Sequence, residues 1–247
     1  GRELRLRAPG GFQRRNFALA RTPAEAFLGA LAPALVKRVA ATLPIPGRLE
    51  QRPEHLATFV DAAHNPDGAA ALAEALPALS DGRRVGACLA ILADKDAGAM
   101  VRALAPALQR AVCTELPASA LEGHGRPGAR SRPATELLGA CEEAGLAAEA
   151  EPDLEAALRR GAELAAADPE GLLLVAGSHY AIAPARAALV DYRASESDGV
   201  GAIGRDGRLV DAAHMRLAEN VLHRASLAAE DGTGAAQDGT GEGASGG

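Results

Sequence analysis

The chain has 247 residues, a formal net charge of −6 at pH 7 and only 2% aromatic residues. The length suits one large domain or a medium domain with appendages, and the negative charge argues against a nucleic-acid platform held by phosphate contacts. No apolar run is long enough to cross a membrane and no signal peptide is visible, so we expect a cytoplasmic protein. The three cysteines, Cys88, Cys113 and Cys141, lack metal-binding spacing and are predicted to be buried thiols.

The first 44 residues are predicted to be helical after a short polar start. Apolar residues between Asn16 and Leu35 recur with loose helical spacing, interrupted by Pro23 and Pro33. The following segment, Pro44–Arg48, holds two prolines and a glycine, which cannot continue a helix. It is therefore predicted to be a hinge or linker.

From Leu49 onward, short apolar runs alternate with helical stretches. The predicted strands are Thr58–Val60, Val85–Leu92, Ala111–Cys113, Leu146–Ala150 and Leu172–Ala176. The predicted helices are Pro66–Leu79, Ala97–Leu108, Pro133–Ala144 and Asp153–Ala167, with a last short helix at Pro184–Val190. This alternation predicts an α/β fold with a Rossmann-like, mostly parallel sheet and helices on both faces. Residues 191–247, rich in Gly, Ser and acidic residues, are predicted to be a disordered tail.

The segment Thr58–Gly68 is predicted to be a strand, a sharp polar turn and the start of a helix. Asn65 suits the N-cap, Pro66 the first helical position, and Asp67 the positive end of the helix dipole. The turn also holds Asp61 and His64 at the carboxyl end of the strand, where open α/β sheets bind ligands. The turn is therefore either a helix cap only or part of a site.

Polar clusters follow four of the five predicted strands. They are Asp61–Asn65, Asp94–Asp96, Thr114–Glu115 and Gly177–Tyr180. Each cluster alone is also explained as a cap, a turn or a loop, and Arg48 as the partner of Glu50 in a surface contact. Because the carboxyl ends of parallel strands share one edge, the clusters together are better explained by a ligand cleft.

These clusters resemble a known family. In order and spacing, the segments resemble those of the folylpolyglutamate synthase and dihydrofolate synthase family, a branch of the Mur ligase superfamily. The segments are Pro46–Glu50, Asp61–Pro66, Ala93–Asp96 and Gly177–Tyr180. Phe12–Ala18 also resembles the family's His-Gln-x-x-Asn-Ala segment, with Phe12 in place of the usual His.

The resemblance covers about residues 10–190 and implies a domain division. Residues 1–44 would be the end of the central ATPase domain, residues 45–49 the hinge, and residues 50–190 the Mur ligase C-terminal domain, which ligates glutamate. Neither Lys37 nor Lys95 follows a glycine, so this chain has no Gly-Lys-Ser/Thr P-loop. We expect the P-loop and the Mg²⁺ ligands in an upstream region.

The resemblance also implies a reaction. The family uses ATP and Mg²⁺ to add L-glutamate to dihydropteroate or to tetrahydrofolate polyglutamates, through an acyl phosphate. The expected partners are these substrates, with no nucleic acid, no membrane and no second copy of the chain. The 247-residue chain by itself is expected to be inactive.

Three residues are implied to bind the nucleotide. Asn16 would contact the adenine edge or the ribose, Arg48 the phosphates, and Asp61 a ribose hydroxyl. Four residues are implied to serve the substrate. His64 and Ser178 would bind the incoming glutamate, and Tyr180 would line the pocket or only pack. Lys95 and His64 are the two catalytic candidates, and Lys95 would neutralise the acyl phosphate or a glutamate carboxylate. No protein metal ligand is assigned.

Two other readings remain open. A related Mur-type ligase could use a different acceptor, such as a cell-wall precursor, although Gly177–Tyr180 favours the folate branch. A non-catalytic Rossmann-like binding module is supported by the missing P-loop. A nicotinamide dehydrogenase is disfavoured, because no Gly-x-Gly-x-x-Gly follows the first predicted strand.

Overall fold

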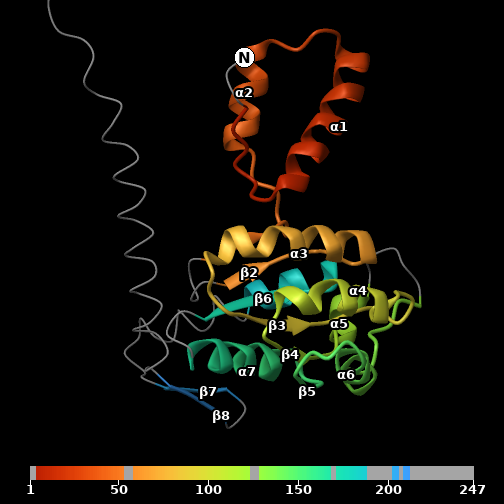
Figure 1. Ribbon diagram of the computed structural model, residues 1–247, viewed down its shortest axis with the longest axis vertical. Helices are drawn as coiled ribbons and strands as arrows, with labels where there is room; N and C mark the ends of the chain where they lie inside the picture. Colours follow the sequence, from red (N-terminus) through yellow and green to blue (C-terminus); the bar gives the residue numbers. More distant parts are fainter. Residues whose placement is uncertain are drawn as a thin grey trace, which may run out of the picture.

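A two-helix unit stands apart from a layered α/β body in the computed structural model of the chain (Figure 1). The structure describes residues 4–52, 58–122, 128–167, 171–187, 202–205 and 208–211. The two-helix unit consists of α1 (Gly11–Leu28) and α2 (Pro33–Thr42), as the helical pattern predicts. It is joined to the body through residues 43–49.

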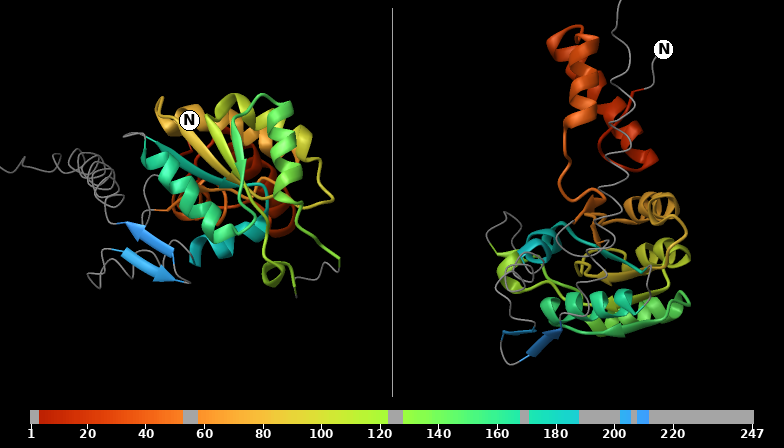
Figure 2. Two further views of the ribbon diagram at one scale, coloured as in Figure 1. Left: turned by 90° about the horizontal axis from the view of Figure 1, so that it is seen from below. Right: turned by 90° about the vertical axis from the view of Figure 1, so that its left-hand side faces the viewer.

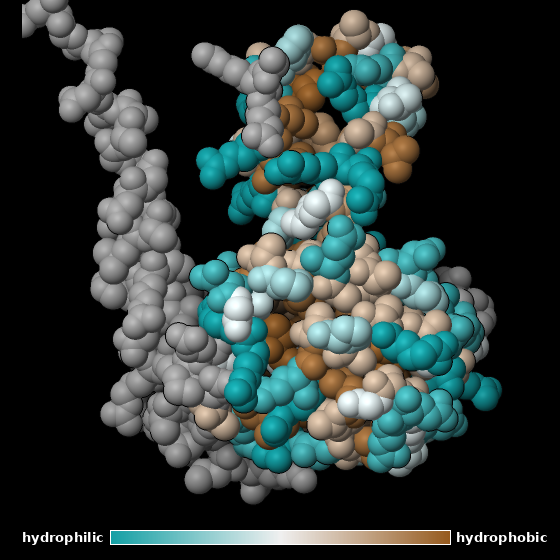
Figure 3. All heavy atoms as spheres, in the orientation of Figure 1, coloured by the Kyte–Doolittle hydropathy of each residue, from teal (hydrophilic) through white to brown (hydrophobic). Residues whose placement is uncertain are grey.

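Helix α1 runs unbroken through Pro23, where an interruption was expected. A proline inside a helix leaves one carbonyl without its N–H partner, here that of Leu19. Leu19 is 71% exposed, so water can satisfy this carbonyl and the helix continues. The other exposed apolar side chains of the unit include Phe27 and Leu28, and hydrophobic residues are visible on its surface in Figure 3. The unit therefore contributes little to the core.

The body is built on a six-stranded sheet in the order β1-β2-β6-β3-β4-β5. Its strands are β1 (Glu50–Gln51), β2 (Thr58–Val60), β3 (Val85–Leu89), β4 (Arg110–Cys113), β5 (Ala148–Ala150) and β6 (Leu172–Ala176). Edge strand β1, which was not predicted, pairs antiparallel with β2, and all other pairs are parallel. The predicted α/β class with a mostly parallel sheet is confirmed.

Two predicted strands are shorter than expected. The strand predicted over Val85–Leu92 ends at Leu89, because Leu92 has turned away to form an isolated antiparallel bridge with Ser131. The strand predicted over Leu146–Ala150 begins at Ala148. The N–H of Leu146 is still bonded to the carbonyl of Cys141 at the end of the preceding helix.

Helices cover both faces of the sheet (Figure 2). They are α3 (Pro66–Ser80), α4 (Ala97–Leu104), α5 (Ala118–Leu121), α6 (Ala134–Glu143) and α7 (Leu154–Ala166). The helix predicted over Ala97–Leu108 ends at Leu104, and a 3-10 turn, η1 (Ala105–Ala107), follows at Pro106. A second 3-10 turn, η2 (His179–Ala181), leads into residues 182–187, which are helical from Ile182 rather than from Pro184. The predicted end of that helix, Val190, lies outside the described residues.

Alternate residues of β6 face opposite layers of the core. Leu172 and Leu174 belong to the cluster that includes Leu72 of α3 and Met100 of α4. Leu173 and Val175 belong to the cluster that includes Leu158 of α7. Because both faces of the central strands are covered, these strands appear in the sequence as continuous apolar runs.

The three cysteines are buried and free, as expected. The thiols of Cys113 and Cys141 lie 3.6 Å apart, where β4 contacts α6. Burial raises the pKa of Cys88 to about 12, so this thiol stays protonated at neutral pH.

Within residues 191–247 the structure describes one antiparallel pair, β7 (Ala202–Arg205) with β8 (Arg208–Asp211), which was not predicted. The rest of the predicted tail lies outside the described residues. Among the described residues, no helix is both long and apolar enough to cross a membrane.

Candidate functional site

The sheet order places the polar clusters side by side at one edge. Strand β6 lies between β2 and β3, so the turn after β6 is flanked by the turns after these two strands. The carboxyl ends of β2, β6 and β3 therefore bring together the clusters that begin at Asp61, Gly177 and Ala93. This is the edge at which open α/β sheets bind ligands.

Asp61 joins the end of β2 to the predicted hinge, residues 45–49. Its side chain is buried, with Oδ2 accepting a hydrogen bond from the Leu49 N–H at 2.8 Å and Oδ1 one from the Ala63 N–H at 2.7 Å. Burial raises the pKa of Asp61, while these two hydrogen bonds and the charges of Arg48 and His64 oppose the rise. The turn after β2 is thereby fixed to the hinge.

The hinge turn itself is tightly constrained. Gly47 and Leu49 both have positive φ angles, 65° and 46°, on either side of Arg48. The left-handed backbone at Gly47 favours glycine, and a Cβ there would require the end of the Ile182 side chain to move. The carbonyl of Gly47 accepts a hydrogen bond from the Ala62 N–H at 2.8 Å. The half-buried Arg48 therefore projects from a turn held against the site.

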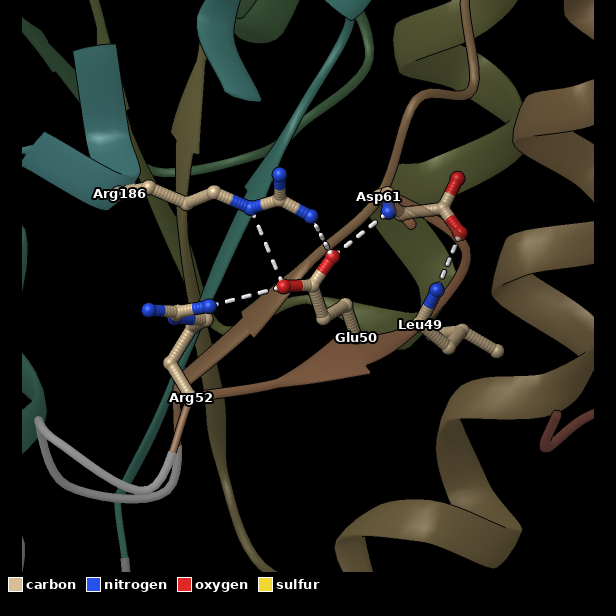
Figure 4. A network of polar contacts seen from close by, with 6 residues as sticks. Leu49, Glu50, Arg52, Asp61 and Arg186 are labelled. Carbon is tan, nitrogen blue, oxygen red and sulfur yellow. Dashed lines mark hydrogen bonds and ion pairs between the residues drawn. The ribbon is translucent and has the colours of Figure 1, made fainter. Parts of the chain in front are cut away.

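Glu50 does not pair with Arg48, which corrects the surface-contact alternative. Its carboxylate instead accepts hydrogen bonds from the Gly47 N–H at 2.7 Å, from Arg52 at 2.9 Å and from Arg186 (Figure 4). Burial alone would raise the pKa of Glu50, but hydrogen bonds from Arg186, Gly47 and Arg52 bring it below its ordinary value. Neither Glu50 nor Arg186 was singled out from sequence.

His64 meets a second histidine that the site prediction did not include. The Nδ1 atom of His64 lies 2.9 Å from the carbonyl oxygen of Ala62. Its ring centroid is 4.5 Å from that of His179, which follows β6. The pKa of His179 is lowered, first by burial and then by the charges of His64 and Arg48. His179 could have been identified from the sequence by its place beside Ser178 at the end of a predicted strand.

Ser178 and Tyr180 shape the turn after β6. Ser178 is buried, and its Oγ accepts a hydrogen bond from the Tyr180 N–H at 3.2 Å, which caps η2. Tyr180 is half-buried and packs against the α7-side core, in line with the packing alternative. Gly177, with φ 110°, lies so close to the Ala90 carbonyl that no side chain fits.

Lys95 lies in the turn after β3, with its Nζ 3.5 Å from the carboxylate of Asp94. Asp96 caps α4 by accepting a hydrogen bond from the Ala99 N–H at 2.8 Å, as the cap alternative predicts. Arg132 holds this turn, because its Nη2 donates to the carbonyl oxygens of Ala93 at 2.7 Å and Lys95 at 2.9 Å. Among the described residues, no hydrogen bond or ion pair joins the Lys95 side chain to His64.

The remaining predicted positions lie apart from this group. Glu115 accepts a hydrogen bond from the Ala134 N–H at 3.1 Å and so serves the start of α6. Asn16, on the exposed side of α1, donates to Oε1 of Gln13 at 3.3 Å. In the part of the chain that the structure describes, Asn16 has no interaction with Arg48 or Asp61. The structure therefore brings together Arg48, Asp61 and His64 with His179, and leaves Asn16 outside.

A metal centre has no support in the described ranges, which contain no group of three or more His, Cys, Asp or Glu side chains that could hold an ion. The fold and the edge define a Rossmann-like α/β domain whose candidate ligand-binding residues gather at the carboxyl ends of β2 and β6.

The chain belongs to the Mur ligase family, since the profile described as "Mur ligase, glutamate ligase domain" matches residues 47–179. The dihydrofolate synthase/folylpolyglutamate synthase of Mycobacterium tuberculosis is 38% identical over 117 residues, which are 45% of this chain and 24% of that protein. The chain thus spans about a quarter of the length of this curated relative.

Solved structures give the same grouping. The folylpolyglutamate synthase of Mycobacterium tuberculosis complexed with ADP superposes with a TM-score of 0.65 at 32% identity, over 83% of this chain and 43% of that one. The bifunctional folylpolyglutamate synthase/dihydrofolate synthase of Yersinia pestis, complexed with AMPPNP and Mn ion, gives a TM-score of 0.53 at 26% identity. That match covers 65% of this chain and 35% of the other.

Proposed function

We propose that the chain is the glutamate-ligating part of an ATP-dependent amide ligase that adds L-glutamate to dihydropteroate, to tetrahydrofolate polyglutamates, or to both. The observation that carries the proposal is the pairing of His64 with His179 at the sheet edge, with Arg48 near enough for its charge to lower the pKa of His179. Family membership and relatives complexed with ADP or AMPPNP support it. Residues 1–44 would then belong to the central ATPase domain, 45–49 to the hinge and 50–190 to the ligase domain.

Arg48 and Asp61 are proposed to contact the nucleotide. ATP supplies the phosphoryl group that activates the acceptor carboxylate as an acyl phosphate, with Mg²⁺ held by residues outside this chain. The Arg48 guanidinium suits phosphate oxygens, which it can bind through two donors at once. Each Asp61 oxygen accepts one backbone N–H and retains a second lone pair for a ribose hydroxyl. Asn16 is proposed for the adenine edge or the ribose, once the domains close.

His64 and Ser178 are proposed to handle the incoming glutamate. Since a carbonyl only accepts, Nδ1 of His64 must donate its proton to Ala62, and a neutral ring then presents the Nε2 lone pair. That lone pair can take a proton from the glutamate ammonium, which must lose one before it attacks. The Ser178 hydroxyl accepts from Tyr180 and still has its own proton to donate to a carboxylate. Lys95 is proposed to neutralise the acyl phosphate or a glutamate carboxylate, and Tyr180 to line the pocket.

The proposal is tested with the longest continuous reading frame that contains this sequence. The measurement is glutamate-dependent ATP hydrolysis and ligated product, with dihydropteroate and tetrahydrofolate as acceptors. Arg48→Ala, Asp61→Ala and His64→Ala should each lower turnover by roughly 10²–10³. Arg160→Ala, at an exposed ion pair with Glu149, is the matched control and should leave turnover unchanged.

A variant with turnover near that of the unsubstituted protein would show that the substituted residue is not part of the site. Ligation to a cell-wall precursor and to neither folate would establish the alternative acceptor instead. The 247-residue chain by itself is expected neither to hydrolyse ATP nor to ligate glutamate, so turnover by the purified chain would contradict the proposed division of labour.

A further inference from the structure

The two residues beside Arg48 are each held by a carboxylate. The Gly47 N–H donates to Oε2 of Glu50 at 2.7 Å, and the Leu49 N–H donates to Oδ2 of Asp61 at 2.8 Å. Hydrogen bonds to ionised acceptors are stronger than neutral ones. The backbone of Arg48 is therefore fixed from both sides.

This turn would not hold its shape unaided. A positive φ is disfavoured for a residue such as Leu49, whose Cβ crowds the following carbonyl. Such a conformation persists only where the surroundings impose it. Leu49 is 1% exposed and belongs to the core, and its N–H is bonded to Asp61. The Glu50 carboxylate supplies the constraint on the other side of Arg48.

Glu50 is itself held by a residue near the end of the domain sequence. Arg186 donates from Nε to Oε1 of Glu50 at 3.1 Å and from Nη2 to Oε2, across a sequence separation of 136 residues. Arg186 lies on the helical residues 182–187, which directly follow the turn that carries His179. Ile182 of the same segment fills the space beside Gly47. The hinge turn and the turn after β6 are thus joined by two separate contacts.

We propose that Glu50, held by its ion pair with Arg186, is a positioning residue. It keeps the Gly47–Leu49 turn in the conformation that places the Arg48 side chain near His64 and His179. The Glu50–Arg186 ion pair acts through Arg48 and does not itself contact a ligand. The ion pair joins the Gly47–Leu49 turn to residues 182–187, which follow the turn that carries Ser178. The two turns therefore keep a fixed position relative to each other. The effect of this ion pair on ligation rests on the proposed function, but its effect on the position of Arg48 can be tested without any ligand.

The test is an NMR titration of His179 in the full 247-residue chain. The variants are Glu50→Gln, Arg186→Lys, Arg48→Gln and the double variant Glu50→Gln/Arg48→Gln. The charge of Arg48 contributes to lowering the pKa of His179, so Arg48→Gln should raise that pKa. If Glu50 positions Arg48, Glu50→Gln should also raise the pKa of His179, and should cause no further rise when Arg48 is already replaced.

The direction of the shift separates this role from a simple charge effect. Loss of a carboxylate charge by itself lowers the pKa of a nearby histidine, because a negative charge favours the imidazolium. A lowered or unchanged His179 pKa in Glu50→Gln would overturn the proposal. A rise of the same size when Glu50→Gln is added to Arg48→Gln would also overturn it, because Arg48 is then absent. Glu149→Gln, which removes the partner of Arg160 far from the hinge, should leave His179 unchanged.

Folding of each variant is checked by urea unfolding. Arg186→Lys keeps the test decisive if Glu50→Gln does not fold, because it retains both charges, while a lysine cannot bind both Glu50 oxygens through the fork geometry of the guanidinium. It too should raise the pKa of His179, and no change would count against the proposal. Absence of ligase activity in the complete reading frame would contradict the proposed function while leaving the titration result intact.

Discussion

The ring of His64 lies with its centroid 4.5 Å from that of His179, at an interplanar angle of 47°. The two histidines come from the turns after β2 and β6, which the sheet order makes neighbours. The charge of His64 contributes to lowering the pKa of His179, because two imidazolium ions at this distance would repel. The pair defines the middle of the candidate site.

The stability of the fold is expected to depend on this pair below neutral pH. The pKa of His179 in the folded chain is below its ordinary value of 6.5, through burial and then the charges of His64 and Arg48. The unfolded chain therefore binds more protons, and stability falls as pH drops from 6.5 toward the folded-state pKa. Urea unfolding at a series of pH values should show this loss, and His179→Gln should reduce it. An unchanged pH dependence in the variant would contradict the prediction.

Asp61→Asn is expected to destabilise the fold by about 1–3 kcal/mol. The two Asp61 oxygens accept from the Leu49 and Ala63 N–H groups, whereas an amide side chain offers only one oxygen. One buried N–H would be left facing another donor. Urea unfolding measures the loss, with Asp67→Asn as control, because Asp67 is exposed on the first turn of α3. Equal effects of the two substitutions would show that the Asp61 bonds are not needed.

Gly47→Ala should destabilise the chain more than Gly82→Ala. Both glycines have positive φ angles, 65° and 77°, so both substitutions impose backbone strain. Only at Gly47 would the new methyl group also collide with Ile182, since nothing lies within 4 Å of a Cβ at Gly82. Because the contacting atom is the flexible end of Ile182, we expect this overpacking to add about 1 kcal/mol, the low end of the usual range. The difference between the two midpoints of unfolding measures the close approach of the hinge to residues 182–187.

Arg132→Met is expected to loosen the turn that carries Lys95. The guanidinium of Arg132 donates to the carbonyl oxygens of Ala93 and Lys95, and its removal leaves both without this donor. We expect a loss of about 1–3 kcal/mol and faster amide exchange in residues 93–97, measured by hydrogen exchange. Arg160→Met, at the exposed pair with Glu149, should cost only about 0–1 kcal/mol. Unaltered exchange in the Lys95 turn would show that other contacts hold it.

The local structure of the chain could be predicted because it depends on residues close in sequence. Asn65, Pro66 and Asp67 start α3 as their side-chain chemistry predicts, with Asn65 accepting from the Gly68 N–H. Continuous apolar runs identified the central strands, since both faces of β6 are buried. Element ends were less predictable, because bonds such as the bridge from Leu92 to Ser131 join distant segments.

The grouping at the sheet edge depended on contacts that no local pattern encodes. The sequence by itself determined the α/β class, the helix cap at Asn65 and the polar residues that follow four of the five predicted strands, because periodicity and capping act over a few residues. Only the tertiary structure decided that β6 lies between β2 and β3, which places His179 beside His64. It alone paired Glu50 with Arg186 across 136 residues, since the sheet order and the packing of the last helix bring those side chains together.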